Sequence, residues 1–337
     1  MVYKATLLGL VLVLAGCNIS SDGKAAPSQT GSSQKVAAKI GYIPIADHML
    51  VGVADELYGD ELLKVDIDPL RFTNYPTMSE ALRSGDLDGA FLLAPLAFQV
   101  KLAGAPVKIV LLGHRDGSGL VVDKAKNITE FKALDQQTVA IPHRFSTNNF
   151  LMHYHGKTAH QSETIDIKTI EAGPPEMFSA LNTGNIDGYI TAEPFLAEAE
   201  LSGVGEVLIF TSEIWKGHPD CVLVLREDYI EKNPDAVQEL ITSMVKAANH
   251  VEADRMGSAA IASRFLGKNI AVMKHSLRDR RRVTFENLVP VNSELERMQN
   301  YMADEMGLFP RKVDMNEIVE DRFARKAYAT IQTNEEE

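Results

Sequence analysis

Short apolar segments alternate with amphipathic segments along most of the chain. The apolar segments are rich in β-branched side chains and have the length of buried strands. The strands that this pattern predicts are residues 37–43, 65–72, 88–93, 107–112, 120–122, 138–141, 164–170, 187–191, 206–210 and 221–225.

Between these strands, apolar residues recur every three or four positions, as they do on the buried face of a helix. The predicted helices are residues 47–57, 77–83, 96–103, 146–160, 174–182, 195–202, 236–251, 259–265 and 293–306. Because strands and helices alternate, the pattern predicts an α/β fold with mostly parallel, doubly wound sheets.

One helix–strand–loop unit occurs twice, in residues 81–95 and 180–194. The matching positions are Ala81 with Ala180, Leu82 with Leu181, Gly85 with Gly184, Asp88 with Asp187, Gly89 with Gly188 and Pro95 with Pro194. In each copy a helix ends at a glycine that can adopt the left-handed conformation, and a buried strand and a proline-marked loop follow. Two copies predict two similar lobes, each with a loop at the carboxyl end of a strand, where open α/β sheets bind ligands.

Two lobes also suit the length of 337 residues, which exceeds one typical domain. The glycine-rich segment 113–119 interrupts the pattern and is predicted to link the lobes, and residues 221–225 return the chain to the first. We therefore predict a first lobe of residues 37–122 and 221–337 and a second lobe of residues 123–220.

The composition excludes several classes of protein. A hydrophobic content of 45% indicates a substantial core, and a net charge of −12 argues against general nucleic-acid binding. The two cysteines, Cys17 and Cys221, cannot form a disulfide framework, and Cys221 is predicted to fill apolar space. His153 and His155 share a predicted helix but lie on different faces, so no metal site is predicted there. No His-Glu-x-x-His, Gly-x-Ser-x-Gly or Cys-x-x-Cys motif occurs, and neither an enzyme nor a cofactor is predicted.

The first residues carry a targeting signal. The apolar run 5–14 is too short to span a bilayer as a permanent helix. Leu14-Ala15-Gly16-Cys17 resembles a bacterial lipobox, which predicts a signal peptide of residues 1–17 and a lipid on Cys17. The alternative is an ordinary secretory peptide with an incidental cysteine. Residues 18–36 are rich in Ser, Gly, Ala and Gln and read as a flexible tether to a folded part outside the cytoplasmic membrane.

The loops at strand ends provide the predicted ligand contacts. From the first lobe these are Asp47, His48, Asn74, Tyr75 and Pro95, from the linking segment Arg115 and Ser118, and from the second lobe His143, Arg144, Ser146, Thr147 and Glu193.

The strongest of these predictions is the helix start after residue 141. Ser146 and Thr147 supply hydroxyl groups beside free backbone N–H groups, and His143 and Arg144 add positive charge, which favours an anion. The alternative is that Ser146 caps the helix while Arg144 faces water.

Two acidic residues leave more alternatives open. Glu193 is interpreted as the working residue of its loop, where it orients His143, binds an amine or, with water and Asp47, helps to hold a cation. The alternative is an exposed loop acid. For Asp47 the alternative is helix capping.

With both copies of the repeat in place, the chain resembles the solute receptors of bacterial ABC importers. Within the type II periplasmic-binding-protein class it is most similar to the nitrate/sulfonate/taurine group, including its nitrate- and bicarbonate-binding branch. The motifs that carry the resemblance are Gly41–His48, Gly85–Pro95, Pro174–Met177, Ala192–Phe195 and Ile214–Pro219.

The resemblance implies two lobes joined by a hinge, with a ligand cleft between them that closes on a small solute. It implies delivery of a small anion, such as nitrate, bicarbonate, a sulfonate or taurine, by a lipid-anchored monomer to a permease driven by an intracellular ATPase. Two alternatives stay open, a receptor-like sensory protein and a binding protein for a pyrimidine-type thiamine precursor. An enzyme on the same fold is disfavoured, because the pyrimidine-synthesising relatives use a cysteine-rich motif that two cysteines cannot supply.

Overall fold

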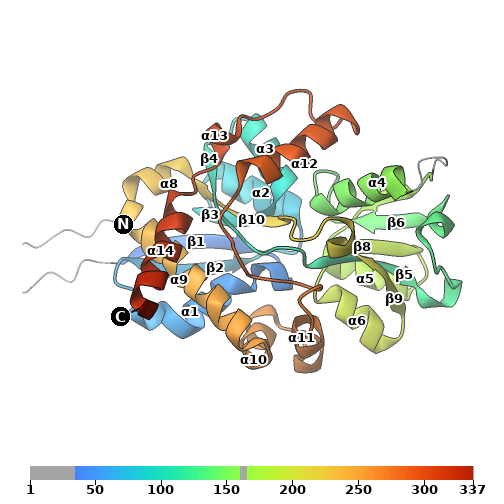
Figure 1. The fold of residues 1–337 in the computed structure, drawn as a ribbon, viewed down its shortest axis with the longest axis horizontal. Coiled ribbons are helices and arrows are strands. Elements are labelled where there is room, and N and C mark those ends of the chain that lie inside the picture. Colours follow the sequence, from blue (N-terminus) through green and yellow to red (C-terminus); the bar gives the residue numbers. More distant parts are fainter. Residues whose placement is uncertain (1–34, 160–164, 337) are drawn as a thin grey trace, which may run out of the picture. The chain divides into compact units, whose positions relative to one another are not determined.

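The computed structural model describes residues 35–159 and 165–336 of the chain (Figure 1). The predicted signal peptide, lipid-bearing Cys17 and most of the tether lie outside the described residues. Within them, no helix combines the length and the apolar character needed to cross a membrane.

The first lobe is built on a five-stranded sheet in the order β2-β1-β3-β10-β4. Its strands are β1 (Val36–Tyr42), β2 (Val65–Arg71), β3 (Gly89–Leu93), β4 (Val107–Leu112) and β10 (Cys221–Arg226). Strand β1 runs parallel to β2 and β3, whereas β10 runs antiparallel to both of its neighbours.

The second lobe repeats this arrangement in the order β7-β6-β8-β5-β9. Its strands are β5 (Ser118–Asp123), β6 (Thr138–Ile141), β7 (Lys168–Glu171), β8 (Gly188–Ala192) and β9 (Gly205–Phe210). Here β5 is the antiparallel strand, between β8 and β9. The predicted α/β fold with two lobes and mostly parallel sheets is confirmed, and each sheet is mixed because one of its five strands, β10 or β5, runs antiparallel to its neighbours.

The two sheets exchange their antiparallel strands. Strand β5 follows β4 in the chain yet pairs in the second sheet, and β10 follows β9 yet pairs in the first. The predicted boundary after residue 122 therefore assigned β5 to the wrong sheet. The sequence pattern identified the glycine-rich segment correctly, but the sheet changes before β5, because this strand completes its hydrogen bonds with β8 and β9.

The helices flank these sheets. They are α1 (Met49–Tyr58), α2 (Tyr75–Ser84), α3 (Ala94–Leu102), α4 (Thr147–Ala159), α5 (Pro174–Asn182), α6 (Phe195–Ser202), α7 (Thr211–Ile214), α8 (Glu227–Lys232), α9 (Pro234–Ala253), α10 (Arg255–Leu266), α11 (Ile270–Leu277), α12 (Asn292–Asp304), α13 (Met315–Ile318) and α14 (Arg322–Glu336). Short 3-10 turns are η1 (Ala46–His48), η2 (Gly59–Glu61), η3 (Lys124–Lys126) and η4 (Phe131–Leu134).

Helix α9 shows how the sequence produces one of these elements. Pro234 begins the helix where no N–H partner is needed, and apolar residues then recur at helical spacing. The buried positions include Val237, Leu240, Ile241, Met244, Val245, Ala248 and Val251. This face packs on α1 and α14.

The repeated unit has a steric explanation. Gly85 and Gly184 both have positive φ angles, +90° and +71°, as predicted for the turns that follow α2 and α5. Gly89 and Gly188 open the central strands β3 and β8. A Cβ atom there would lie 2.8 Å from the carbonyl oxygen of Val224 and 2.7 Å from that of Val121, respectively. Each glycine thus allows close approach of the antiparallel neighbour.

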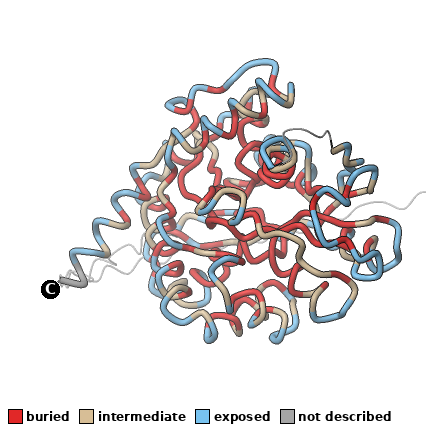
Figure 2. Tube along the Cα trace, turned by 45° about the vertical axis from the view of Figure 1, so that its right-hand side comes forward, coloured by how far each residue is buried: buried red, intermediate tan, exposed pale blue. Residues whose placement is uncertain are grey.

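The central strands are fully enclosed by the rest of the molecule. All residues of β3 and β8 are buried, and exposed residues gather on the outer turns of the helices (Figure 2). The carboxyl ends of these buried strands place the loops described next.

Candidate ligand-binding site

Six polar side chains meet where the chain passes between the two sheets. We call them the junction cluster: Asp47, Tyr75, His114, Ser118, Asp220 and Cys221. Each has an exposed fraction of 2% or less. Burial of this many polar groups is costly unless they are paired or serve a ligand.

The first lobe contributes two of these side chains from strand ends. Asp47 lies in η1, shortly after β1, and Tyr75 begins α2 after β2. Tyr75 Oη is 3.7 Å from Cys221 Sγ, and burial raises the pKa of Tyr75 well above its ordinary value. Both residues were predicted from their positions at strand ends.

The crossing segments contribute the other four. His114 follows β4, Ser118 begins β5, Asp220 precedes β10 and Cys221 begins it. The two crossings lie side by side, because the backbone of Arg115 forms an antiparallel β-bridge with Pro219. A second β-bridge joins Arg115 to Thr284. The chain therefore brings residues far apart in the sequence into one buried volume.

His114 and Asp47 are close but do not form a hydrogen bond. His114 Nε2 lies 2.9 Å from Asp47 Oδ2, yet the relative orientation of the two groups does not allow a hydrogen bond. Both ring nitrogens of His114 and Asp47 Oδ1 also lack a hydrogen-bond partner among the described residues. Burial holds the pKa of His114 well below its ordinary value, and burial raises that of Asp47, with Asp220 and Glu193 adding to the rise.

Cys221 completes this part of the cluster. Its Sγ lies 3.9 Å from Asp47 Oδ2, and burial raises the pKa of the thiol well above its ordinary value. The prediction that Cys221 merely fills apolar space missed these polar neighbours.

Asp220 connects the cluster to the second lobe. Ser118 Oγ donates to Asp220 Oδ2 at 2.7 Å, and Thr147 Oγ1 lies 3.5 Å from the Asp220 carbonyl oxygen. Asp220 Oδ1 has no hydrogen-bond partner among the described residues, and neither does Nδ2 of the neighbouring Asn148. Thr147, which was predicted as a ligand contact at the start of this helix, thus lies at the edge of the cluster.

His48 lies beside the cluster in η1. Its Nδ1 is 3.0 Å from the backbone N of Ile43, and its ring stacks on Phe91. Burial lowers the pKa of His48 to about 3, so the ring is neutral near pH 7. Its Nε2 has no hydrogen-bond partner among the described residues.

Glu193 is buried, which differs from the exposed-acid alternative, and its carboxylate is occupied by other parts of the protein. Arg282 forms an ion pair with Oε1, and Ser276 Oγ and the backbone N of Ala197 donate to Oε2 at 2.9 and 3.1 Å. Burial raises the pKa of Glu193, whereas the Arg282 guanidinium opposes that rise. The backbone of Glu193 joins the lobes, because Ala46 N donates to its carbonyl oxygen at 2.7 Å.

The cationic residues predicted to attract an anion are paired with carboxylates. Arg144 is exposed and donates to Glu171 at 2.6 Å, and His143 Nε2 lies 3.7 Å from the same carboxylate. Arg115 donates to Glu294 at 3.1 Å, away from the junction cluster.

Three further predicted residues have structural contacts instead. Ser146 Oγ accepts from Asn149 N at 3.0 Å, which is the capping alternative, and Asn74 Oδ1 caps α2 by accepting from Thr77 N at 3.0 Å. Pro95 is buried in the first turn of α3.

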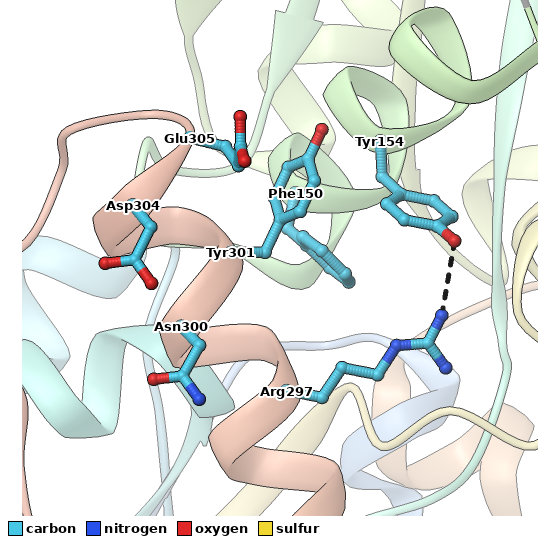
Figure 3. Close-up of a pocket in the computed structure, with 7 residues that line it drawn as sticks. All are labelled: Phe150, Tyr154, Arg297, Asn300, Tyr301, Asp304 and Glu305. Carbon is cyan, nitrogen blue, oxygen red and sulfur yellow. Dashed lines mark hydrogen bonds between the residues drawn. The ribbon is translucent and has the colours of Figure 1, made fainter.

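A surface pocket lies apart from the cluster, between α4 and α12 (Figure 3). It has a volume of about 360 Å³ and is lined by Phe150, Tyr154, Arg297, Asn300, Tyr301, Asp304 and Glu305. Arg297 donates to the Tyr154 hydroxyl at 3.4 Å, and its guanidinium lies 4.3 Å from the centre of the Trp215 ring. None of these residues belongs to the junction cluster.

The sequence of the chain matches the model of a known protein family. The model of the NMT1-like family matches residues 31–267, more than half of the chain. The chain belongs to the NMT1-like family. This membership confirms the predicted resemblance.

The relatives of this NMT1-like protein include transport proteins. It is 29% identical over 232 residues to the nitrate import ATP-binding protein NrtC of Synechococcus elongatus, covering 64% of this chain and 35% of the relative. It is 25% identical over 275 residues to the nitrate/nitrite binding protein NrtA of a Nostoc species, covering 73% and 62%. The chain thus spans about a third of the length of the first of these curated relatives and less than two thirds of the second.

A solved structure is similar over almost the whole described fold. It is the ligand binding component of an ABC-type import system from Staphylococcus aureus, determined with zinc bound. The TM-score is 0.79 at 26% identity, covering 87% of this chain and 99% of that one.

Proposed function

We propose that this protein is the solute-binding component of an ABC importer. It works outside the cytoplasmic membrane, held there by a lipid on Cys17, and delivers a small solute to a permease driven by an ATPase. The observation that carries the proposal is the junction cluster, because polar side chains from both lobes and both crossings are buried together there. Relatives named for nitrate import, nitrate binding and ligand binding in an import system support this role over catalysis.

The geometry supports capture by movement of the lobes. Asp47 and Tyr75 come from the first lobe and Thr147 from the second, so a solute that contacts all three holds the lobes together. Such a solute shifts the protein toward the closed state in proportion to its differential affinity. The crossings at residues 113–117 and 217–220 are then the hinge.

A small anion is the proposed solute, since two relatives are named for nitrate. The junction cluster supplies the hydroxyl group of Tyr75, and Asn148, which follows Thr147, has an amide donor without a hydrogen-bond partner among the described residues. The side chains of Asp47 and Asp220 lie in the same volume.

Thermal unfolding with a panel of nitrate, bicarbonate, taurine, alkanesulfonates and pyrimidines tests the proposal. A solute present at 100 times its Kd is expected to stabilise the protein by about 2.7 kcal/mol, because it binds only the folded state. We expect Ser118→Ala to lose most of this response, because the Ser118 hydroxyl orders Asp220 within the cluster.

Ser202→Ala is the matched control, because the Ser202 hydroxyl donates to Ala199 O, within α6 and away from the junction cluster. This variant should keep the full response. Absence of any response in folded protein, or an equal response in both serine variants, would contradict the proposed site.

A further inference from the structure

We propose that Asp47, His114 and Cys221 bind one divalent transition-metal ion of the zinc class. The sequence predicted no metal site along α4 and left open only that Asp47, with Glu193 and water, helps to hold a cation. The proposal concerns the same junction cluster and rests on the proposed function only for the ion's part in solute capture. Binding of the ion itself rests on the geometry of the three side chains.

The three donor atoms are close enough to share one ion. One atom each from Asp47, His114 and Cys221 lies within 4.8 Å of the other two. The separations are 2.9 Å between His114 Nε2 and Asp47 Oδ2 and 3.9 Å between Asp47 Oδ2 and Cys221 Sγ. In a tetrahedral zinc site such atoms lie roughly 3.4 to 3.6 Å apart, so side-chain shifts of up to about an ångström bring the three donors into place.

The orientation of His114 and Asp47 favours binding of one shared ion over a direct hydrogen bond between the two side chains. A neutral imidazole beside a carboxylate normally donates its N–H, but these two groups lie 2.9 Å apart without a hydrogen bond. Both residues are buried, with exposed fractions of 0% and 1%. Side-by-side approach of a nitrogen and an oxygen is what coordination of a common ion requires.

Gly117 keeps a side chain away from the donor atoms. Its φ of +93° is in the left-handed region, and it follows Asp116, whose φ is 59°. This turn brings the backbone against the two donor groups. A Cβ atom at residue 117 would lie 2.8 Å from His114 Nε2 and 3.1 Å from Asp47 Oδ1.

The types of donor select the class of metal. One thiol, one imidazole and one carboxylate suit zinc and similar ions, whereas calcium and magnesium prefer oxygen ligands throughout. Three protein ligands also leave a fourth position for water or a solute, as in zinc sites that exchange their ligand.

The charge balance points the same way. The junction cluster contains the carboxylates of both Asp47 and Asp220. The nearby guanidinium groups form ion pairs with other carboxylates, Arg115 with Glu294 and Arg282 with Glu193 and Glu200. A divalent cation offsets the Asp47 carboxylate and the Cys221 thiolate that forms on binding, and its open coordination position is the point where an anionic solute attaches.

Metal titration of the full chain in detergent, after treatment with a chelator and dialysis, tests the inference. Competition with a chromogenic chelator is expected to show one zinc ion per chain, and calcium should not compete. Cobalt(II) should give the near-ultraviolet charge-transfer band of a cobalt–thiolate bond. Cys221→Ser is expected to abolish the band and to weaken zinc binding by about 100-fold or more. Loss of a residue that only hydrogen-bonds to a ligand typically costs 10- to 100-fold, and loss of the ligand itself should cost more.

Cys17→Ser is the matched control, because Cys17 and Cys221 are the two cysteines of the chain. It should keep both the band and the affinity. His114→Gln provides a second variant and should weaken zinc binding if Cys221→Ser does not fold. Zinc affinity equal to wild type in folded Cys221→Ser or His114→Gln protein, or loss of the band in Cys17→Ser, would overturn the proposal.

The same samples separate this inference from the proposed function. If a solute of the panel stabilises the protein but zinc does not bind, the metal site is wrong and the receptor role stands. If zinc binds at Cys221 but no solute acts with or without it, the metal site stands and the proposed anion solute is wrong.

Discussion

Replacing Arg282 with methionine should destabilise the protein by about 3 to 5 kcal/mol, the cost that is typical of removing one partner of a buried ion pair. Arg282 has an exposed fraction of 2% and pairs with Glu193 and Glu200, and its guanidinium lies 5.1 Å from the centre of the Phe210 ring. Without it, the fully buried Glu193 carboxylate keeps only Ser276 and Ala197 as donors. Denaturant unfolding followed by circular dichroism measures the change.

Two controls separate the lost charge from the lost volume. The double variant Arg282→Met/Glu193→Gln should recover most of the stability, because a neutral amide carries no buried charge. Arg144→Met should leave the stability nearly unchanged, since the pair of Arg144 with Glu171 is largely exposed. If the double variant were no more stable than Arg282→Met, the buried charge would not be the cause.

Replacing His114 with leucine should have the opposite effect and stabilise the ligand-free protein by about 1 to 3 kcal/mol. The substitution removes two buried ring nitrogens that have no hydrogen-bond partner among the described residues, and it keeps a similar side-chain volume. The low pKa of His114 means that no charge is lost near pH 7. The response to zinc and to solute should disappear, because His114 is a proposed ligand of the ion. Binding sites often carry such a cost in stability.

His153→Leu is the control for this variant. His153 is exposed on α4, and its Nδ1 lies 3.0 Å from the Tyr301 hydroxyl, so its replacement should not stabilise the protein. Unfolding free energies of both variants decide the matter. A His114→Leu protein less stable than wild type would show that the His114 ring is satisfied in a way that the structure does not display.

Most of the fold was predictable because it depends on local periodicity. The predicted strands from residues 37 to 225 all correspond to observed strands, and α5 and α6 have the predicted bounds. The assignment of β5 failed because partner choice in a sheet is a long-range property. Helices α11 and α14 were not predicted individually, since the C-terminal part gives only a general helical pattern.

The candidate site was predictable only where it follows strand ends. Asp47, Tyr75 and Thr147 were found by this rule, and Ser118 by its place in the linking segment. His114, Asp220 and Cys221 were missed, although they flank the two predicted crossings between the lobes. The positions of the two crossings were the available signal for these residues. Two segments that pass side by side bring together residues that are far apart in the sequence.

Arg282 shows the limit of reading charge from sequence. It lies in residues 278–282, where four arginines indicate a solvated loop, and Arg280 and Arg281 are indeed exposed. Only the packing of this segment against α6 and β9 buries the side chain of Arg282.

A crystal structure of the full chain, grown with the panel solute that stabilises it most, tests the site assignment most directly. The solute is expected within hydrogen-bond distance of Tyr75 and Asn148, between the lobes, with contacts to the junction cluster. A solute bound instead in the pocket between α4 and α12, with the junction cluster unchanged, would contradict the assignment.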